Sequence, residues 1–250
     1  MSMDFKDHFS GHASLYAQAR PHYPDALFEW IAEAAPTRDC VWDAACGNGQ
    51  ASIVLSRRFT RVIATDPSAQ QIAQAQRHPR IEYRIEAAER SSLQDHSADA
   101  ITVAQALHWF DLPRFIEEVR RVARPGALFA AWSYAGCSVD AEIDAVIARL
   151  YDDILGEYWP PERQLVDEGY ASLAIPCAPL DAPAFEMRVD WNTGQLLAYL
   201  RSWSAAQRYR QKTGRDAMAE IADDLQHAWG DPQDVRAVRW KLALRASRVG

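Results

Sequence analysis

The ten residues Val41–Gln50, which read VWDAACGNGQ, constrain the fold of this chain more than any other segment. A short apolar run leads directly into a Gly-x-Gly turn at Gly47 and Gly49, and a helical pattern follows the turn. Because glycine has no Cβ atom, such a turn lets the backbone approach a ligand closely. The first amides of the following helix lack intrahelical partners and can bind that ligand. The pattern therefore predicts a buried strand, a ligand-binding turn and a helix.

Two carboxylates accompany this turn in the sequence. Asp43 lies inside the first strand, and Asp66 ends the next apolar run, residues 61–66. A carboxylate at the end of the second strand of such a unit accepts hydrogen bonds from the hydroxyls of a ribose. The turn and the two acids together indicate an adenosine-containing cofactor bound to an α/β fold.

Apolar runs and helical patterns alternate through the first half of the chain. Arg124-Pro125-Gly126 is typical of a turn before the last of these runs. Strands that alternate with helices at this spacing predict a parallel sheet with right-handed crossovers, whose ligands gather at the carboxyl ends of the strands. We expect strands over residues 40–45, 61–66, 81–86, 98–104 and 127–132, and helices over 27–34, 51–58, 67–75 and 112–123.

The regular alternation fails after Trp132. A long insert in a compact domain is usually functional, so we expect the middle of the chain to cover the ligand site. In this second half, helical patterns cover residues 141–151, 193–210 and 216–229, and strand patterns cover 185–191 and 235–246.

Composition narrows the class of partner. The chain has 250 residues and a formal net charge of −7, which argues against binding to nucleic acid or to an anionic membrane surface. No apolar run approaches the roughly 20 residues of a membrane span, and the polar start of the chain lacks the apolar core of a signal peptide. We therefore expect a cytoplasmic protein. The four cysteines are scattered without a C-x-x-C pair, so neither a metal site nor a disulfide framework is expected.

Three features distinguish between the cofactors that use a Gly-x-Gly turn. Ser52 occupies the position where a dinucleotide-binding fingerprint needs its third glycine. Asp43 precedes the turn, and an aromatic-rich insert follows the first α/β half in place of a second nucleotide-binding half. These features favour S-adenosylmethionine (SAM) over NAD. An NAD-linked oxidoreductase stays open as the less favoured enzyme class.

The chain resembles the class I SAM-dependent methyltransferases over nearly its whole length. Residues 43–49, DAACGNG, are similar to the first motif of that family, D-x-x-C/G-G-x-G, and Asp66 matches the acidic end of its second strand. Trp42 stands where the family has a small aliphatic residue, which changes packing and not ligand chemistry. The resemblance implies an α/β, Rossmann-like fold with a seven-stranded, mostly parallel sheet sandwiched by helices and with helical cap insertions.

A second stretch resembles one subgroup of the methyltransferases of type 11, which includes the trans-aconitate methyltransferases. Residues 99–110, DAITVAQALHWF, are similar to the fourth-strand motif of this subgroup, as are Tyr16, residues 20–24 (RPHYP) and residues 202–204 (SWS). The resemblance divides the chain into an N-terminal arm and helix over the cofactor, a SAM-binding core, an inserted cap, and the last two core strands with a helical cap segment between them. These parts are residues 1–36, 37–133, 134–183 and 184–250.

The resemblance also implies roles at the cofactor site. The backbone at Gly47 and Gly49 passes close to the methionine half of SAM, and Asp66 accepts both ribose hydroxyls. Asp43 either anchors the turn or accepts a hydrogen bond from the ammonium group of the cofactor. The other expected contacts lie along the adenine and ribose, beneath the transferring methyl group and on the arm: Pro67, Ser68, Ala88, Glu89, Ala104, Gln105, Tyr16 and Arg20.

Several residues have a plain alternative to the functional role. Glu89 is equally well a solvated loop charge. His108, whose side chain ordinarily titrates near neutrality, could be a general base for the acceptor or could position the cofactor through a hydrogen bond. Trp109, Trp132 and Trp203 are candidate walls of an acceptor pocket, and each could instead belong to the apolar core.

These assignments predict methyl transfer from SAM to a small organic acceptor. A carboxylic acid is the first candidate, because a carboxylate is already ionised at neutral pH and needs no general base. The alternative from another class is a SAM-binding sensor or assembly protein without turnover, which would need no acceptor pocket. We expect a small-molecule partner, no nucleic acid or membrane partner, and a monomer or homodimer.

Overall fold

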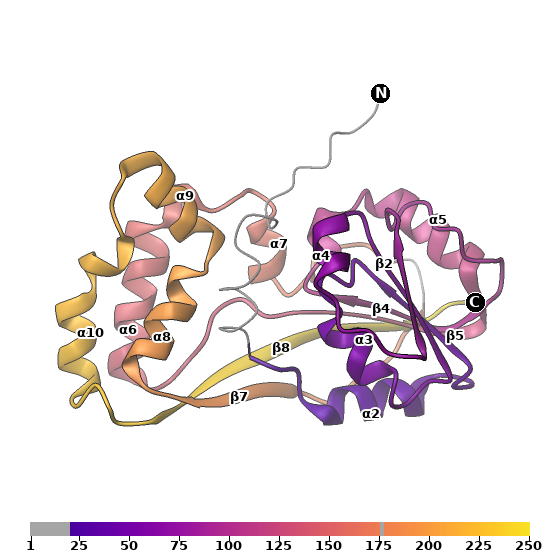
Figure 1. Cartoon of the computed structure of the whole chain (residues 1–250), viewed down its shortest axis with the longest axis horizontal. Helices are drawn as coiled ribbons and strands as arrows, with labels where there is room; N and C mark the ends of the chain where they lie inside the picture. Colours follow the sequence, from indigo (N-terminus) through magenta and orange to yellow (C-terminus); the bar gives the residue numbers. More distant parts are fainter. Residues whose placement is uncertain (1–20, 176–177) are drawn as a thin grey trace.

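The computed structural model describes residues 21–175 and 178–250 of the chain. A mixed sheet lies at its centre, in the order β3-β2-β1-β4-β5-β8-β6 (Figure 1). The last strand, β8 (Arg236–Arg248), runs antiparallel to β5, so the predicted seven-stranded, mostly parallel sheet is confirmed. The five parallel strands are β1 (Cys40–Ala44), β2 (Arg61–Asp66), β3 (Ile81–Ile85), β4 (Ala98–Ala104) and β5 (Ala123–Ser133).

Successive side chains of each strand face opposite sides of the sheet and build two apolar layers. On one side, Val41 packs in a cluster with α2, α3 and α4. On the other side, Trp42 packs in a cluster with α5 and α7. Because both faces of the sheet are covered, a ligand can reach the central strands only at their ends. The covering helices are α2 (Asp25–Ala34), α3 (Gln50–Leu55), α4 (Ala69–Ala73), α5 (Leu112–Val122) and α7 (Arg163–Asp167).

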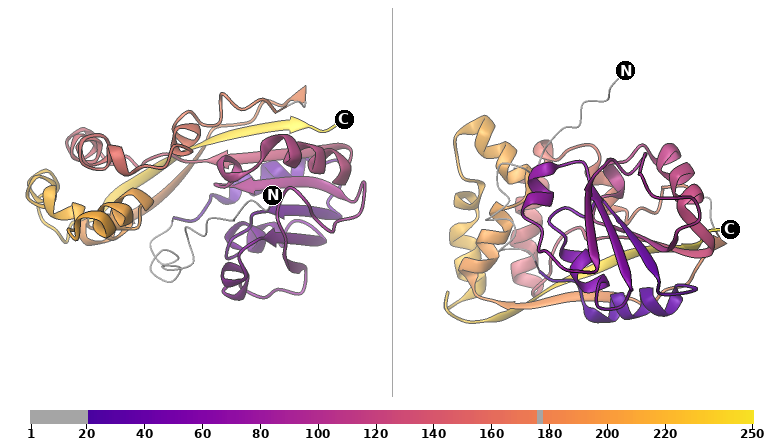
Figure 2. Two further views of the ribbon diagram at one scale, coloured as in Figure 1. Left: turned by 90° about the horizontal axis from the view of Figure 1, so that it is seen from above. Right: turned by 45° about the vertical axis from the view of Figure 1, so that its right-hand side comes forward.

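Four helices, which we call the cap, lie together at one end of the molecule (Figure 1). They are connected to the sheet by an antiparallel ribbon of β7 (Phe185–Trp191) and the first half of β8 (Figure 2). The second half of β8 pairs with β5, so one strand belongs to both parts. The cap comprises α6 (Ala141–Arg149), α8 (Thr193–Arg201), α9 (Ser204–Thr213) and α10 (Ala222–Trp229), with the short turns η2 (Leu150–Ile154), η3 (Gly156–Tyr158) and η4 (Ala217–Glu220).

The structure departs from several predicted elements. The single helix expected over 216–229 is the short turn η4 followed by α10, with Ile221 between them. Residues 124–126, expected as a turn, belong to β5, because Gly126 adopts a φ of +76° and accommodates a register shift against β4. The single helix expected over 193–210 is two helices, since Trp203 turns the chain with an extended backbone. The pairing of β6 (Ala178–Pro179) with the end of β8 was absent from the expected strands.

Candidate functional site

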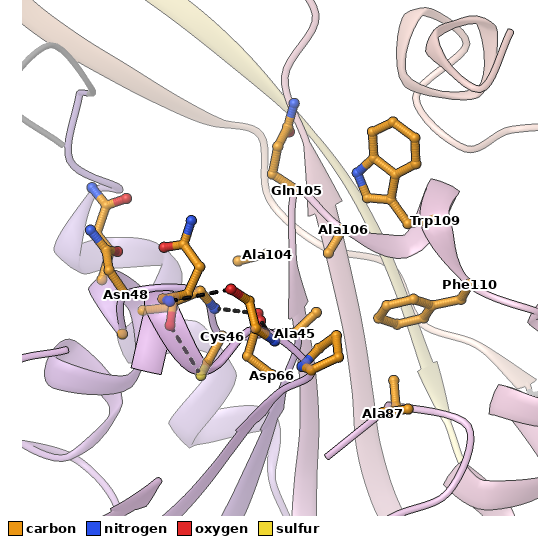
Figure 3. Close-up of a pocket in the computed structure, with 18 of the residues that line it drawn as sticks. Ala45, Cys46, Asn48, Asp66, Ala87, Ala104, Gln105, Ala106, Trp109 and Phe110 are labelled. Atoms are coloured by element: carbon orange, nitrogen blue, oxygen red, sulfur yellow. Dashed lines mark hydrogen bonds between the residues drawn. The ribbon is translucent and has the colours of Figure 1, made fainter. Parts of the chain in front are cut away.

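A cavity of about 1670 Å³ opens where β1, β2 and β4 end (Figure 3). The short helical turn η1 (Leu107–Trp109) follows β4 and forms part of its wall. The position agrees with the rule that ligands of parallel sheets bind beyond the carboxyl ends of the strands. Ten residues singled out from the sequence line this cavity: Gly47, Gly49, Asp66, Pro67, Ser68, Ala88, Glu89, Ala104, Gln105 and Trp109.

The turn after β1 is built from residues in the left-handed backbone region. Ala45, Gly47 and Gly49 have φ values of +54°, +56° and +82°. A Cβ atom on Gly49 would lie 2.3 Å from the Tyr83 hydroxyl oxygen, whereas one on Gly47 would meet only the Gln71 side chain at 3.9 Å. Glycine is therefore required at Gly49 by both conformation and space, and at Gly47 by conformation alone. The predicted close approach of backbone to ligand is available here.

The carboxylate of Asp66 is held by the two loops that flank it. Its Oδ2 accepts a hydrogen bond from the Gly47 amide at 2.9 Å, and its Oδ1 accepts one from the Ser68 amide at 2.8 Å. Figure 3 shows this side chain at the cavity, close to the turn that contains Cys46. A carboxylate oxygen can accept more than one hydrogen bond, so these two bonds alone do not exhaust what Asp66 can accept. Asp66 is thus preorganised for a diol.

Asp43 lies behind the turn and not in the cavity wall. It is fully buried, and it accepts hydrogen bonds from the Ser52 hydroxyl at 2.5 Å and the Thr102 hydroxyl at 3.0 Å. Burial raises the pKa of this carboxyl to about 6, and the nearby Asp66 contributes in the same direction. The placement favours the anchoring role. Ser52, noticed in the sequence only because it is not glycine, ties α3 to β1 through this bond.

The loop after β3 lies over the part of the cavity that is lined by Pro67, Ala88 and Phe110. Glu89 belongs to the same wall, and its Oε1 accepts a hydrogen bond from the Asp111 amide at 3.0 Å. The side chain therefore joins this loop to the start of α5 and is more than a solvated charge. The apolar side chains beside it suit the flat face of an adenine ring.

His108 follows β4 but does not lie in the cavity wall. Its Nδ1 is 3.0 Å from the hydroxyl oxygen of Tyr170, and its ring lies 4.6 Å from the ring of Trp109. Burial, together with the positive charge of Arg163, lowers the pKa of this imidazole to about 3. This environment favours a positioning role over general-base catalysis.

The other tryptophans predicted as pocket walls lie in the apolar core. Trp132 is fully buried in β5, with its ring 5.5 Å from the ring of Tyr23 in an edge-on arrangement. Trp203 packs among cap residues, with its ring 5.6 Å from Trp159 and 5.9 Å from Tyr199. Neither lines the cavity, so each takes the plain alternative that the sequence left open.

Gln105 has a structural role that the sequence did not reveal. Its φ is +56°, which is unusual for a residue other than glycine. Its side-chain Nε2 donates to the Tyr134 carbonyl at 3.0 Å, and its Oε1 accepts from the Tyr134 amide at 2.8 Å. These two hydrogen bonds join the end of β4 to the end of β5. The ring of Tyr134 in turn packs edge-on against Tyr23, another residue of the cavity wall.

Glu162 is a further wall residue that sequence reasoning missed. Among the described residues beyond β5, it is the one that lines the cavity. It immediately precedes α7, which packs against η1, so it lies on the side of the cavity where Trp109 is found. The side chain is half-buried and forms no hydrogen bond or ion pair within the described part of the chain. Nothing in its local sequence pattern marks it as functional.

The remaining expectations concern the arm, metals and membranes. Tyr16 and Arg20 lie outside the described residues. Within residues 21–175 and 178–250, no three His, Cys, Asp or Glu side chains are grouped as a metal site would need. No helix in the described ranges is long and apolar enough to cross a membrane.

Comparisons with known proteins agree with this geometry. The profile of a family described as "Methyltransferase domain" matches residues 42–131. A protein of Dictyostelium discoideum named as a methyltransferase is 32% identical over 229 residues, which cover 90% of this chain and 87% of that protein. A solved structure from Anaeromyxobacter dehalogenans, described as a type II methyltransferase, is 49% identical with a TM-score of 0.88, and the match covers 92% of this chain and 98% of that one.

A further likeness covers about half of the chain. A Saccharomyces cerevisiae protein named as an S-adenosylmethionine-dependent methyltransferase is 31% identical over 128 residues, which are 48% of this chain and 44% of that protein. The first two matches cover nine-tenths or more of this chain, whereas this match covers about half of it.

Proposed function

The chain belongs to the SAM-dependent methyltransferases, and from this premise we propose that it methylates a small organic acceptor held beside SAM in the cavity at the carboxyl ends of β1, β2 and β4. The observation that carries the proposal is the cavity itself. A single drug-sized ligand occupies about 300–1,000 Å³, and this cavity measures about 1670 Å³. It has room for a cofactor and for a second molecule.

We propose that the cofactor lies across the ends of β1 and β2. The backbone at Gly47 and Gly49 would lie along its methionine half, Asp66 would accept from the ribose hydroxyls, and Ala88 would border the adenine. The preorganised carboxylate and the left-handed turn support this assignment. Asp43 would act from behind by holding the turn through Ser52.

SAM, when bound, supplies a methyl group that transfers from its positively charged sulfur to the acceptor, and S-adenosylhomocysteine is released. The protein would contribute alignment and the exclusion of water. Trp109 presents an aromatic wall next to the end of β4, where a π face favours positive charge. Gln105 keeps that end of β4 in place through its clamp on Tyr134. No step requires a protein nucleophile.

Two classes of acceptor fit different features of this site. A carboxylic acid, as in the trans-aconitate methyltransferases that residues 99–110 resemble, would need no base, and His108 lies outside the cavity wall. A hydroxyl or amine acceptor is favoured by Glu162, a cavity-lining acid whose carboxylate has no hydrogen-bond or ion-pair partner among the described residues. Such a carboxylate would take up a proton from this acceptor and would repel an anionic one.

Transfer of a labelled methyl group from SAM to two panels of compounds tests the proposal. One panel holds small dicarboxylic and tricarboxylic acids, and the other holds phenols, alcohols and amines of similar size. Glu162→Gln is assayed with the best compound of each panel. A rise in activity toward acids supports the carboxylate class, and a loss of activity toward hydroxyls or amines supports the second class. Methylation of neither panel, with S-adenosylhomocysteine binding intact, would contradict a small acceptor.

A further inference from the structure

A hydrogen bond connects η1, the helical turn that carries Trp109, to a segment far away in the sequence. His108 in η1 and Tyr170, which lies beyond α7, are separated by 62 positions, and Nδ1 of the first is 3.0 Å from the hydroxyl oxygen of the second. Their rings lie nearly parallel, with centroids 6.0 Å apart. Tyr170 is fully buried. This pair is thus a polar contact between η1 and the segment that follows α7.

The backbone that carries Tyr170 is conformationally costly. Gly169 and Tyr170 have consecutive left-handed φ values of +59° and +62°. For a large side chain such a conformation is unfavourable and persists only where its surroundings enforce it. A Cβ on Gly169 would lie 2.7 Å from the Cβ of Ala243 in β8, so the turn is pressed against the sheet. The amide of Tyr170 donates to the Leu165 carbonyl at 2.8 Å, which closes the turn. The fold thus holds this hydroxyl at a defined position.

The consequence of this bond reaches the cavity through Trp109. The ring of Trp109 lines the cavity and lies 4.6 Å from that of His108. The imidazole has little freedom, because it lies between that indole and the phenol of Tyr170. Burial and the charge of Arg163 keep it neutral, so the hydrogen bond persists across the physiological pH range.

We propose that Tyr170 is a positioning residue for methyl transfer, which acts through His108 to hold Trp109 in the wall of the acceptor half of the cavity. The inference rests on the proposed function, since it assigns the acceptor to this wall. The cofactor half of the cavity, around Asp66, does not depend on the bond. Tyr170 should therefore affect acceptor use and leave cofactor affinity unchanged.

Removal of one oxygen atom tests the proposal. Tyr170→Phe deletes the hydroxyl and keeps the ring. The matched control is Tyr199→Phe, which also removes one buried hydroxyl. That hydroxyl, in the cap helix α8, accepts a 2.9 Å hydrogen bond from the Trp240 indole in β8. Amide hydrogen exchange of peptides that span residues 105–111 reports on η1. Calorimetry with S-adenosylhomocysteine reports on the cofactor half, and the KM and kcat of the acceptor found in the panels report on the other half.

We expect Tyr170→Phe to accelerate exchange over residues 105–111 and to raise the acceptor KM roughly tenfold, while S-adenosylhomocysteine affinity stays within about twofold. Tyr199→Phe should leave all three unchanged. His108→Gln gives a second test. If Tyr170 acts through His108, the acceptor KM of the Tyr170→Phe/His108→Gln double variant is no higher than that of the more affected single variant. Equal exchange rates over residues 105–111 in Tyr170→Phe and Tyr199→Phe would overturn the proposal. Equal losses of cofactor and acceptor binding in Tyr170→Phe would overturn it as well. If the wild type methylates no compound, the proposed function fails, while the exchange comparison still decides whether Tyr170 holds η1.

Discussion

The two halves of the cavity are built by different means. Around β1 and β2, backbone amides and left-handed turn residues make the wall, and Asp66 is held by the amides of Gly47 and Ser68. Beyond β4, side chains hold one another across long sequence separations, as in the pair His108 and Tyr170. The first half is set by local rules that act within one strand-turn-helix unit. The second half depends on how a distant segment packs.

Asp66→Ala should show the largest difference between the two halves of the cavity, as a loss of affinity for S-adenosylhomocysteine. The substitution removes a carboxylate that accepts from two backbone amides, and hydrogen bonds to charged groups contribute about 1.5–3 kcal/mol each. Affinity for S-adenosylhomocysteine should fall roughly 100-fold or more in calorimetric titrations. Asp140→Ala is the matched control, since Asp140 also accepts from a backbone amide, at the start of the cap helix α6. Similar losses in both variants would erase the distinction between the halves.

A second comparison lies within the turn. Gly49→Ala combines a left-handed conformation with an overlap against Tyr83 and should lower the free energy of unfolding by about 3 kcal/mol, whereas Gly47→Ala should lower it by about 1 kcal/mol. Urea unfolding measures both. If the overlap is the cause, the cost of Gly49→Ala in a Tyr83→Ala background drops to that of Gly47→Ala. An undiminished cost in that background would show that space around Tyr83 is irrelevant.

The carboxyl behind the turn makes stability depend on pH. Burial raises the folded-state pKa of Asp43 to about 6, above its unfolded value, so the folded state binds the extra proton. The contribution of this group therefore destabilises the fold above pH 6 and is relieved as the pH falls through 6. The wild type should gain about 1 kcal/mol relative to Asp43→Asn between pH 7.5 and pH 5. Parallel stability curves for the two proteins would contradict the raised pKa.

The smallest change in cofactor affinity is expected from a substitution in the cap. Trp203→Phe trims a ring that packs against Trp159 and Tyr199 and does not line the cavity. The melting temperature should fall because packing is lost, yet affinity for S-adenosylhomocysteine should change by less than about twofold, near 0.4 kcal/mol. A tenfold loss of affinity would mean that the cap, like the turn, supports the cofactor half.

The same contrast explains which features the sequence could predict. The strands, the turn and the cavity position of Asp66 follow from apolar periodicity and from glycine at fixed places, and all of these are local. The partner of His108 was beyond reach, because Tyr170 meets it only through the packing of α7. The turn expected at residues 124–126 failed for a related reason: Ala123 pairs with Ala98 at the start of β4 and Leu128 pairs with Ala100, so the residues between them continue β5. Glu162 gave no signal, since a lone acid before a short helix has no periodic pattern.

The strand β8 sets a condition on how this enzyme could acquire a new acceptor. Its 13 residues pair first with β7 in the ribbon and then with β5 in the sheet, so both pairings share one register. A slip of a single residue would exchange the inward and outward side chains along its whole length. Exchange of residues 192–235, which lie between β7 and β8, leaves both pairings intact and transplants three cap helices as a module. A chimera joined within β8 would have to keep the number of residues in this strand unchanged, whatever their sequence.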